Sequence, residues 1–300
     1  MFNLLKVIPL AFDSLGVRSQ ATFVQTRDLN IIIDPAAALA PRRFGLPPHR
    51  VEVKRLHELS SIIEEFLRES DVAIITHYHY DHHDPGRIIP LESYRGKTLI
   101  AKDPKNKINV SQKIRASRFL KLVDKYISKI EVADSKCFMF GRTKICFSKP
   151  VPHGVNDRLG YVVEVLIDDG EEKFLYTSDV EGPVLREQVE FILLHKPNIL
   201  IVDGPLTYML GYKFSMSDLW KSIKNLKEII GALKSSVIIL DHHLLRDSEY
   251  RDRLHEIYDY AKTLRVKVVS AAEYLGKPID VLEVRRKELY EKEYAPGKLF

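Results

Sequence analysis

The sequence predicts a mixed α/β protein with the layers of an αββα four-layer sandwich. Short β-branched runs separated by turn residues fill the first third of the chain, and amphipathic helices alternate with short apolar runs in the second half. Each half is thus rich in strands and carries helices that need a sheet to cover. With 300 residues, 45% of them hydrophobic, the chain can form one large domain over residues 1–300.

The first half is expected to pair antiparallel strands and then to alternate helices with strands. Apolar residues within 54–68 mark one helical face, and a basic amphipathic helix is expected at 109–126. The expected strands lie at 4–8, 21–25, 29–33 and 72–76, and near 129, 137, 143, 160 and 172.

The second half is expected to alternate strands and helices regularly. Ser215 and Asp218 have the spacing of a capping box, which predicts the start of a helix at Met216. From about residue 285 the sequence is charged and is predicted to be a tail. The expected helices lie at 184–195, 216–233 and 248–264, and the expected strands at 198–202, 236–240 and 266–270.

Charge and hydropathy limit the possible partners. The net charge of +5 suits an anionic partner, but it also suits an ordinary intracellular protein. Eight Lys/Arg lie within 102–125, which could bind phosphate or nucleic acid, but the stretch has few aromatic residues for stacking on bases, so a solvated helix face is favoured. No apolar run is long enough to cross a membrane and no signal peptide is expected, so we expect a cytoplasmic protein without a membrane partner. The oligomeric state stays open.

Two cysteines flank a predicted tight turn at Gly141 and Arg142. Counting outward from this turn pairs Cys137 with Cys146 at a site where side chains of neighbouring strands lie closest, so the two sulfurs could meet. Abundant Lys, Arg and Glu with little Gln are typical of proteins from hot environments, where intracellular disulfides are commoner. For a cytosolic protein, however, we expect a reduced, buried pair.

A cluster of ligand-type side chains follows the strand at 72–76. His77, His79, Asp81 and His82 lie within six residues, and this H-x-H-x-D-H pattern is far more specific than a single pair of histidines. Imidazoles combined with carboxylates suit zinc, iron or manganese rather than magnesium or calcium. The cluster predicts a site for two metal ions, which needs further ligands from elsewhere in the chain.

Three candidates for those ligands also follow predicted strands. His153 stands before a glycine, Asp179 directly follows the segment KFLYTS, and His242 directly follows the segment SVIILD. His243 is the alternative to His242. We prefer His242 because its distance from the preceding strand matches that of His77.

On these residues, the chain resembles the metallo-β-lactamase superfamily, including an archaeal branch that carries the same DHH segment. The match runs from Asp34 to His242, and the fold that it implies is the αββα sandwich. It implies that Asp34 supports the site without binding metal and that Asp179 bridges the two ions. By the same resemblance one metal would be held by His77, His79 and His153, and the other by Asp81, His82 and His242.

The predicted activity is hydrolysis by a hydroxide that bridges two divalent ions, with zinc expected first. Asp81 would bind metal and orient this nucleophile, and the substrate would be a small ester, amide, lactone or phosphodiester, including anionic ones. Candidate substrate residues in loops after strands are Arg42, Arg43, Asp203, Tyr208 and Tyr212, each with an ordinary packing or solvated role as its alternative.

Three other functions share the predicted metal site. A nuclease is not favoured, because nothing the size of a nucleic-acid-binding arm interrupts the chain. Di-iron redox chemistry is disfavoured by His79, which stands where redox members of the superfamily have a glutamate. A non-catalytic metal-binding protein is less favoured because the ligand set is complete.

Overall fold

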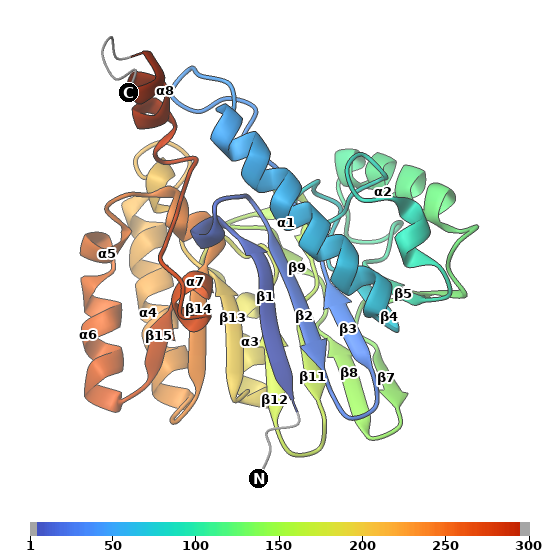
Figure 1. The fold of residues 1–300 in the computed structure, drawn as a ribbon. Helices are drawn as coiled ribbons and strands as arrows, with labels where there is room; N and C mark the ends of the chain where they lie inside the picture. Colours follow the sequence, from blue (N-terminus) through green and yellow to red (C-terminus); the bar gives the residue numbers. More distant parts are fainter. Residues whose placement is uncertain (1–4, 295–300) are drawn as a thin grey trace.

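The computed structural model describes residues 5–294 and contains two mixed β-sheets packed face to face, with helices on their outer sides (Figure 1). The αββα architecture is therefore confirmed. Leu4, where the first strand was predicted to begin, and residues 295–300 of the predicted charged tail lie outside the described residues.

The first sheet contains the amino-terminal strands in sequence order, β1-β2-β3-β4-β5-β6. Strands β1 to β3 are antiparallel, and β3 to β6 are parallel. The strand β5 was missing from the sequence prediction. The bounds are β1 Lys6–Phe12, β2 Gln20–Gln25, β3 Asn30–Ile33, β4 Val72–Ile75, β5 Thr98–Ala101 and β6 Lys129–Val132.

The second sheet has the order β15-β14-β13-β12-β11-β8-β7, and its strands β12 to β15 are parallel. A separate two-stranded sheet pairs β9 (Val151–Pro152) with β10 (Tyr161–Val162). The bounds in the large sheet are β7 Cys137–Phe140, β8 Thr143–Phe147, β11 Val165–Asp168, β12 Lys173–Tyr176, β13 Ile199–Asp203, β14 Val237–Asp241 and β15 Lys267–Val269.

The helices α1 to α6 largely follow the prediction, with one break, whereas α7 and α8 were not predicted. The predicted helix at 248–264 is divided at Leu254 into α5 and α6. Among the described residues, no helix has the length and apolar character needed to cross a membrane. The bounds are α1 Arg50–Glu69, α2 Val110–Val123, α3 Glu187–His195, α4 Met216–Ala232, α5 Tyr250–Arg253, α6 His255–Leu264, α7 Ala271–Tyr274 and α8 Arg286–Tyr294.

Strand alternation builds three apolar layers. In β3, Ile31 and Ile33 face the second sheet, whereas Ile32 packs with α1 and α2 on the outer face. In β13, Ile201 lies between the sheets and Leu200 packs with α3, α4 and α6. Because both faces of each sheet are covered, the central strands are apolar throughout, which explains their continuous hydrophobic runs.

The charged segment after residue 285 contains α8, and its first residue is buried. Arg286 has no exposed surface and forms two hydrogen bonds of 2.7 Å with the carboxylate of Glu52 in α1. It also donates to the carbonyls of Ala40 and Leu46, at 3.0 and 3.1 Å. The arginine thus fixes the start of α8 against the amino-terminal end of α1.

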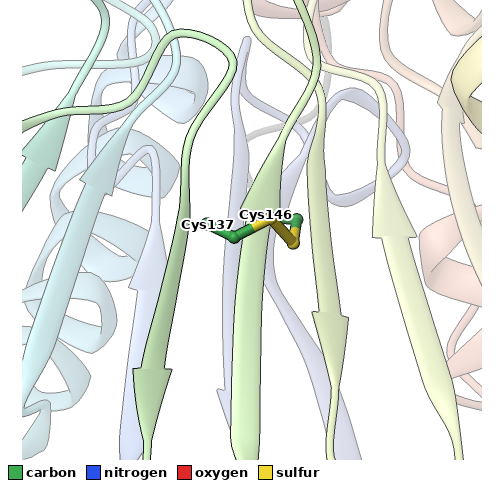
Figure 2. Close-up of a disulfide and its surroundings, with 2 residues drawn as sticks. All are labelled: Cys137 and Cys146. Atoms are coloured by element: carbon green, nitrogen blue, oxygen red, sulfur yellow. A yellow bond between two sulfur atoms is a disulfide. The ribbon is translucent and has the colours of Figure 1, made fainter.

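The two cysteines form a disulfide across β7 and β8 (Figure 2). The predicted pairing of Cys137 with Cys146 is confirmed, with the two Cα atoms 4.1 Å apart. The expected reduced, buried pair is wrong on two counts. The register brings the sulfurs into bonding distance, and only Cys146 is buried, because Cys137 lies on the exposed face of an edge strand.

Candidate metal centre

The cluster of candidate ligands lies at one edge of the sandwich, where parallel strands from both sheets end. His77 to His82 follow β4 in the first sheet, Asp179 follows β12 in the second, and His242 follows β14. The small sheet adds His153, directly after β9. Since the carboxyl ends of parallel strands meet at the same edge, residues far apart in the sequence come together there.

The structure brings the seven predicted ligands into two groups that share Asp179. Ligand atoms of His77, His79, His153 and Asp179 lie within 4.8 Å of one another, and so do those of Asp81, His82, His242 and Asp179. The Asp179 carboxylate faces both groups, with one oxygen toward each. Its Oδ2 lies 3.5 Å from His77 Nε2 and 3.3 Å from His153 Nε2, whereas its Oδ1 lies 2.9 Å from His82 Nε2 and 3.2 Å from His242 Nε2.

The donor set fits divalent metal ions of the zinc, iron and manganese type. The buried Nε2 atom of His77 has no hydrogen-bond partner among the described residues, which is costly unless another group binds there. Burial lowers the pKa of His77 well below its usual value and that of His79 to about 3, so both rings are neutral and can donate a lone pair. Nitrogen and carboxylate donors together match this class of ion.

Asp34 holds His82 in place. Its Oδ2 accepts a hydrogen bond from His82 Nδ1 at 2.8 Å and another from the Tyr176 hydroxyl at 2.8 Å. Its Oδ1 accepts the backbone N–H of Thr76 at 2.8 Å. A histidine that donates Nδ1–H to a carboxylate presents Nε2 to a metal in a fixed orientation. This contact is the geometry that the supporting role implied for Asp34 by the resemblance would need, and the role itself stays a prediction.

Sharp backbone turns position several of these side chains. Asp34, Ser178 and His242 all have positive φ angles, 48°, 60° and 62°, which are unfavourable for residues with a Cβ. Each stands one or two residues after a strand ends. Such conformations cost about 1–3 kcal/mol each and persist where the surrounding structure holds them, so the turns are part of how the site is built.

Sequence reasoning missed a carboxylate and an arginine that hold His242. Asp13 Oδ2 accepts from His242 Nδ1 at 2.7 Å, and Asp13 Oδ1 accepts from Arg246 Nε at 2.8 Å. All three side chains are buried. Asp13 directly follows β1, so the strand-end signal used for Asp34 would have found it had the first strand been predicted to reach residue 12. Arg246 follows His242 by one helical turn, a spacing that alone indicates nothing.

The two neighbouring histidines have different surroundings. His242 belongs to the group with Asp81, whereas His243 Nδ1 lies 2.9 Å from Asp203 Oδ2. Asp203 is fully buried and also accepts the backbone N–H of Glu181 at 2.7 Å. His243 shares a different group of candidate ligand atoms, with Asp203 and Asp179, so His242 as the ligand of the second group stays a prediction.

Two cavities adjoin the cluster and share Tyr208 as a wall. The larger, about 460 Å³, is lined by His153 and Glu181 and reaches outward to Arg158, Tyr212 and Lys213. The smaller, about 320 Å³, is lined by Thr207, by three arginines (Arg43, Arg246 and Arg253) and by the carboxylates of Asp247 and Glu249. A cavity of about 510 Å³ lies elsewhere, between β1 and α1, and contains none of the candidate ligands.

The remaining substrate candidates divide between these surfaces and solvent. Tyr208, Tyr212 and Arg43 line the cavities beside the cluster, but Arg42 is exposed and lines neither of them.

Within the basic stretch at 102–125, Lys102 does not belong to a charged face. Its side chain is buried and its Nζ lies 2.7 Å from Asp134, because the chain turns inward after β5.

Solved structures with similar folds define the class of the architecture. Unliganded yeast PDE1 aligns with a TM-score of 0.54 at 12% identity, covering 89% of this chain and 97% of that one. The isothiocyanate hydrolase from Delia radicum gut bacteria aligns with a TM-score of 0.52 at 17% identity, covering 84% and 94%. The metallo-β-lactamase fold protein YhfI from Bacillus subtilis has a TM-score of 0.50 at 14% identity, covering 89% and 96%. The fold is that of the metallo-β-lactamase superfamily.

Sequence relatives identify the family within this class. A UPF0282 protein from Sulfurisphaera tokodaii is 51% identical over 297 residues, covering 98% of this chain and 96% of the relative. Another from Metallosphaera sedula is 50% identical over 296 residues, covering 98% and 96%. The chain belongs to the UPF0282 family. No family model matches the sequence.

Proposed function

We propose that this protein is a hydrolase that uses two divalent metal ions, most simply zinc, to cleave a small ester, lactone or phosphodiester. The observation that carries the proposal is the position of Asp179, whose two oxygens each face a separate group of buried ligand atoms. A single structural ion would need one group only. Two divalent ions, when bound, supply a water of lowered pKa and polarise the oxygen under attack.

The roles of the protein's own residues follow from their contacts. His77, His79 and His153 would hold one ion, and Asp81, His82 and His242 the other. Asp179 would bridge the two ions. Asp34 and Asp13 would fix the rings of His82 and His242 by accepting their Nδ1–H groups. Asp81, the least buried of the seven candidates alongside His79, would also orient the attacking water.

The substrate would enter through the cavity of about 460 Å³ beside His153. This volume is in the range of small-molecule sites, and Val155, Leu206 and Met209 give it an apolar wall. The cations Arg158 and Lys213 at its rim suit a substrate with negative charge. Ligands come from both sheets, so we propose one hydrolase domain for the whole chain.

The test combines metal analysis with turnover. Protein purified without added metal should contain about two equivalents of metal, and it should hydrolyse bis(p-nitrophenyl) phosphate, a lactone or a nitrocefin-like lactam with Zn²⁺, Mn²⁺ or Fe²⁺. His79→Ala should lose turnover, whereas His57→Ala, which changes an exposed histidine of α1, should behave as wild type. Failure of every substrate with every metal, together with unchanged metal content in His79→Ala, would refute the proposal.

A further inference from the structure

Two residues that line the cavity of about 320 Å³ each have a buried polar atom without a hydrogen-bond partner among the described residues. Thr207 is 1% exposed, and its Oγ1 has no hydrogen-bond partner among the described residues. The Nε of Arg43, which lines the same cavity, is also buried without a hydrogen-bond partner in the described part of the chain. Buried donors without acceptors are uncommon in folded proteins, so two on residues that line one cavity make this cavity a candidate site for an acceptor.

Arg43 is also the cation of this cavity with the weakest ion pairing. Its Nε lies 3.9 Å from Glu283, but that carboxylate already accepts two hydrogen bonds from Arg18, at 2.6 and 2.7 Å. The other two arginines have close partners. Arg246 lies 2.8 Å from Asp13, and Arg253 lies 2.9 Å from Asp247 and 2.5 Å from Glu249. An acceptor in the cavity would therefore find Arg43 available without breaking an existing strong pair.

The arginine is held in one orientation by its neighbours. Its guanidinium carbon lies 4.7 Å from the ring centroid of Tyr208 and 4.9 Å from that of Phe44, and one terminal nitrogen donates to the carbonyl of Arg246 at 3.0 Å. A guanidinium fixed between aromatic rings loses little freedom on binding an anion. The site is thus preorganised for an acceptor with negative charge.

The cavity touches the candidate metal centre through one side chain. Arg246 lines the cavity, and its Nη2 lies 3.2 Å from His242 Nε2 and 3.8 Å from Asp81 Oδ2. Tyr208 separates this cavity from the larger one that opens on His153. A group bound by Arg43 would therefore lie beside the second group of ligands, across Tyr208 from the proposed substrate entrance.

We propose that this cavity is an oxyanion-binding subsite, in which Arg43 and the Thr207 hydroxyl donate hydrogen bonds to a phosphate or carboxylate group of the substrate. The inference rests on the proposed function, because it places the bond to be cleaved at the metal centre and the anionic group beyond it. It narrows the substrate to a molecule with a permanent negative charge remote from the scissile bond. Charge-assisted hydrogen bonds of this kind are the strong ones in recognition.

Direct binding tests the subsite independently of turnover. Isothermal titration with inorganic phosphate, and separately with acetate, is carried out on the protein as purified and after removal of metal by a chelator. We expect an anion-binding component that survives chelation and weakens about 10- to 100-fold in Arg43→Met and about 3- to 10-fold in Thr207→Val. Arg142→Met, in the exposed turn between β7 and β8, is the matched control and should bind as wild type. Whichever anion binds more tightly identifies the group.

Turnover then separates failure of the subsite from failure of the hydrolase. Three p-nitrophenyl carboxylic esters share the scissile bond and differ at the far end of the acyl chain. The butanoate is neutral, the glutarate monoester carries a remote carboxylate, and the third ester carries a remote phosphonate in place of that carboxylate. We expect a higher kcat/KM for an anionic ester than for the butanoate. Arg43→Met should remove this preference by lowering kcat/KM for the anionic esters, whereas Arg142→Met should keep the preference. Equal rates for all three esters, or anion binding that is unchanged in Arg43→Met and Thr207→Val, would overturn the subsite and leave the hydrolase standing. If the wild-type protein hydrolyses none of the esters but still binds anions in a way that depends on Arg43, only the proposed hydrolase function is overturned.

Discussion

Replacing Arg286 by methionine should destabilise the protein strongly, although the residue lies in a charged segment near the end of the sequence. The substitution removes two hydrogen bonds of 2.7 Å to Glu52 and two to backbone carbonyls. Glu52 is fully buried and would keep only the backbone N–H of His49, at 2.8 Å. Breaking a buried ion pair from one side costs about 3–5 kcal/mol, and we expect about 4 kcal/mol here.

The assay is equilibrium unfolding in guanidinium chloride, with a matched neighbour as the control. Arg285 precedes Arg286 and pairs with Asp280 and Glu288 at the surface, so Arg285→Met should change the free energy of unfolding little. In the double variant Glu52→Gln/Arg286→Met the unpaired charge is gone, so its loss should be smaller than the sum of the single losses by about 2 kcal/mol or more. A loss below about 1 kcal/mol in Arg286→Met, or additive single losses, would refute the reasoning.

Three further predictions concern the candidate metal centre and the disulfide. Asp13→Asn should weaken binding of one of the two metal ions by about 10- to 100-fold, seen as a drop toward one equivalent in metal analysis, because His242 loses its orienting carboxylate. Burial alone would lower the pKa of His242, but the carboxylates of Asp179 and Asp13 together outweigh burial and raise this pKa to about 10. A metal ion must therefore displace this proton, so apparent affinity should rise by about tenfold per pH unit between about pH 7 and pH 9, and a pH-independent affinity in chelator competition would contradict this. The disulfide closes a loop between cysteines that are 9 residues apart in the sequence, which lowers the entropy of the unfolded chain. Replacing both cysteines by serine should therefore lower the free energy of unfolding by about 2–3 kcal/mol, and an unchanged free energy of unfolding would contradict this reasoning.

Local patterns predicted the candidate ligands because most of them follow a strand that the sequence makes recognisable. His153 is the exception, since it directly follows β9, which was not predicted. The apolar run before His77 fixes where that strand ends, and parallel pairing brings such ends to one edge. The resemblance to metallo-β-lactamases added the grouping of the ligands into two sets. The contact between Asp13 and His242 could not be predicted in this way, since 229 residues separate them and no periodicity links the two.

Buried charges escaped prediction for a related reason. Arg286 and Lys102 belong to stretches whose composition is that of solvated surface, and composition does not show which charge meets a partner in the interior. The disulfide shows a different limit. The hairpin turn determined the register of Cys137 and Cys146, and so their pairing could be predicted. Their redox state does not follow from the register. We predicted reduced cysteines because we expected a cytosolic protein, and that prediction was wrong.

Asp179 contacts candidate ligands that follow strands of both sheets, and this affects how the protein would resist heat. Under the proposed function, the ions bind only when the two sheets are packed together, so metal binding and folding are linked equilibria. At a free metal concentration of about 1,000 times Kd, one such ion adds about 4 kcal/mol to the free energy of unfolding. The unfolding temperature would then depend on the metal supply of the cell, and the same chain could be robust or fragile without a change in sequence.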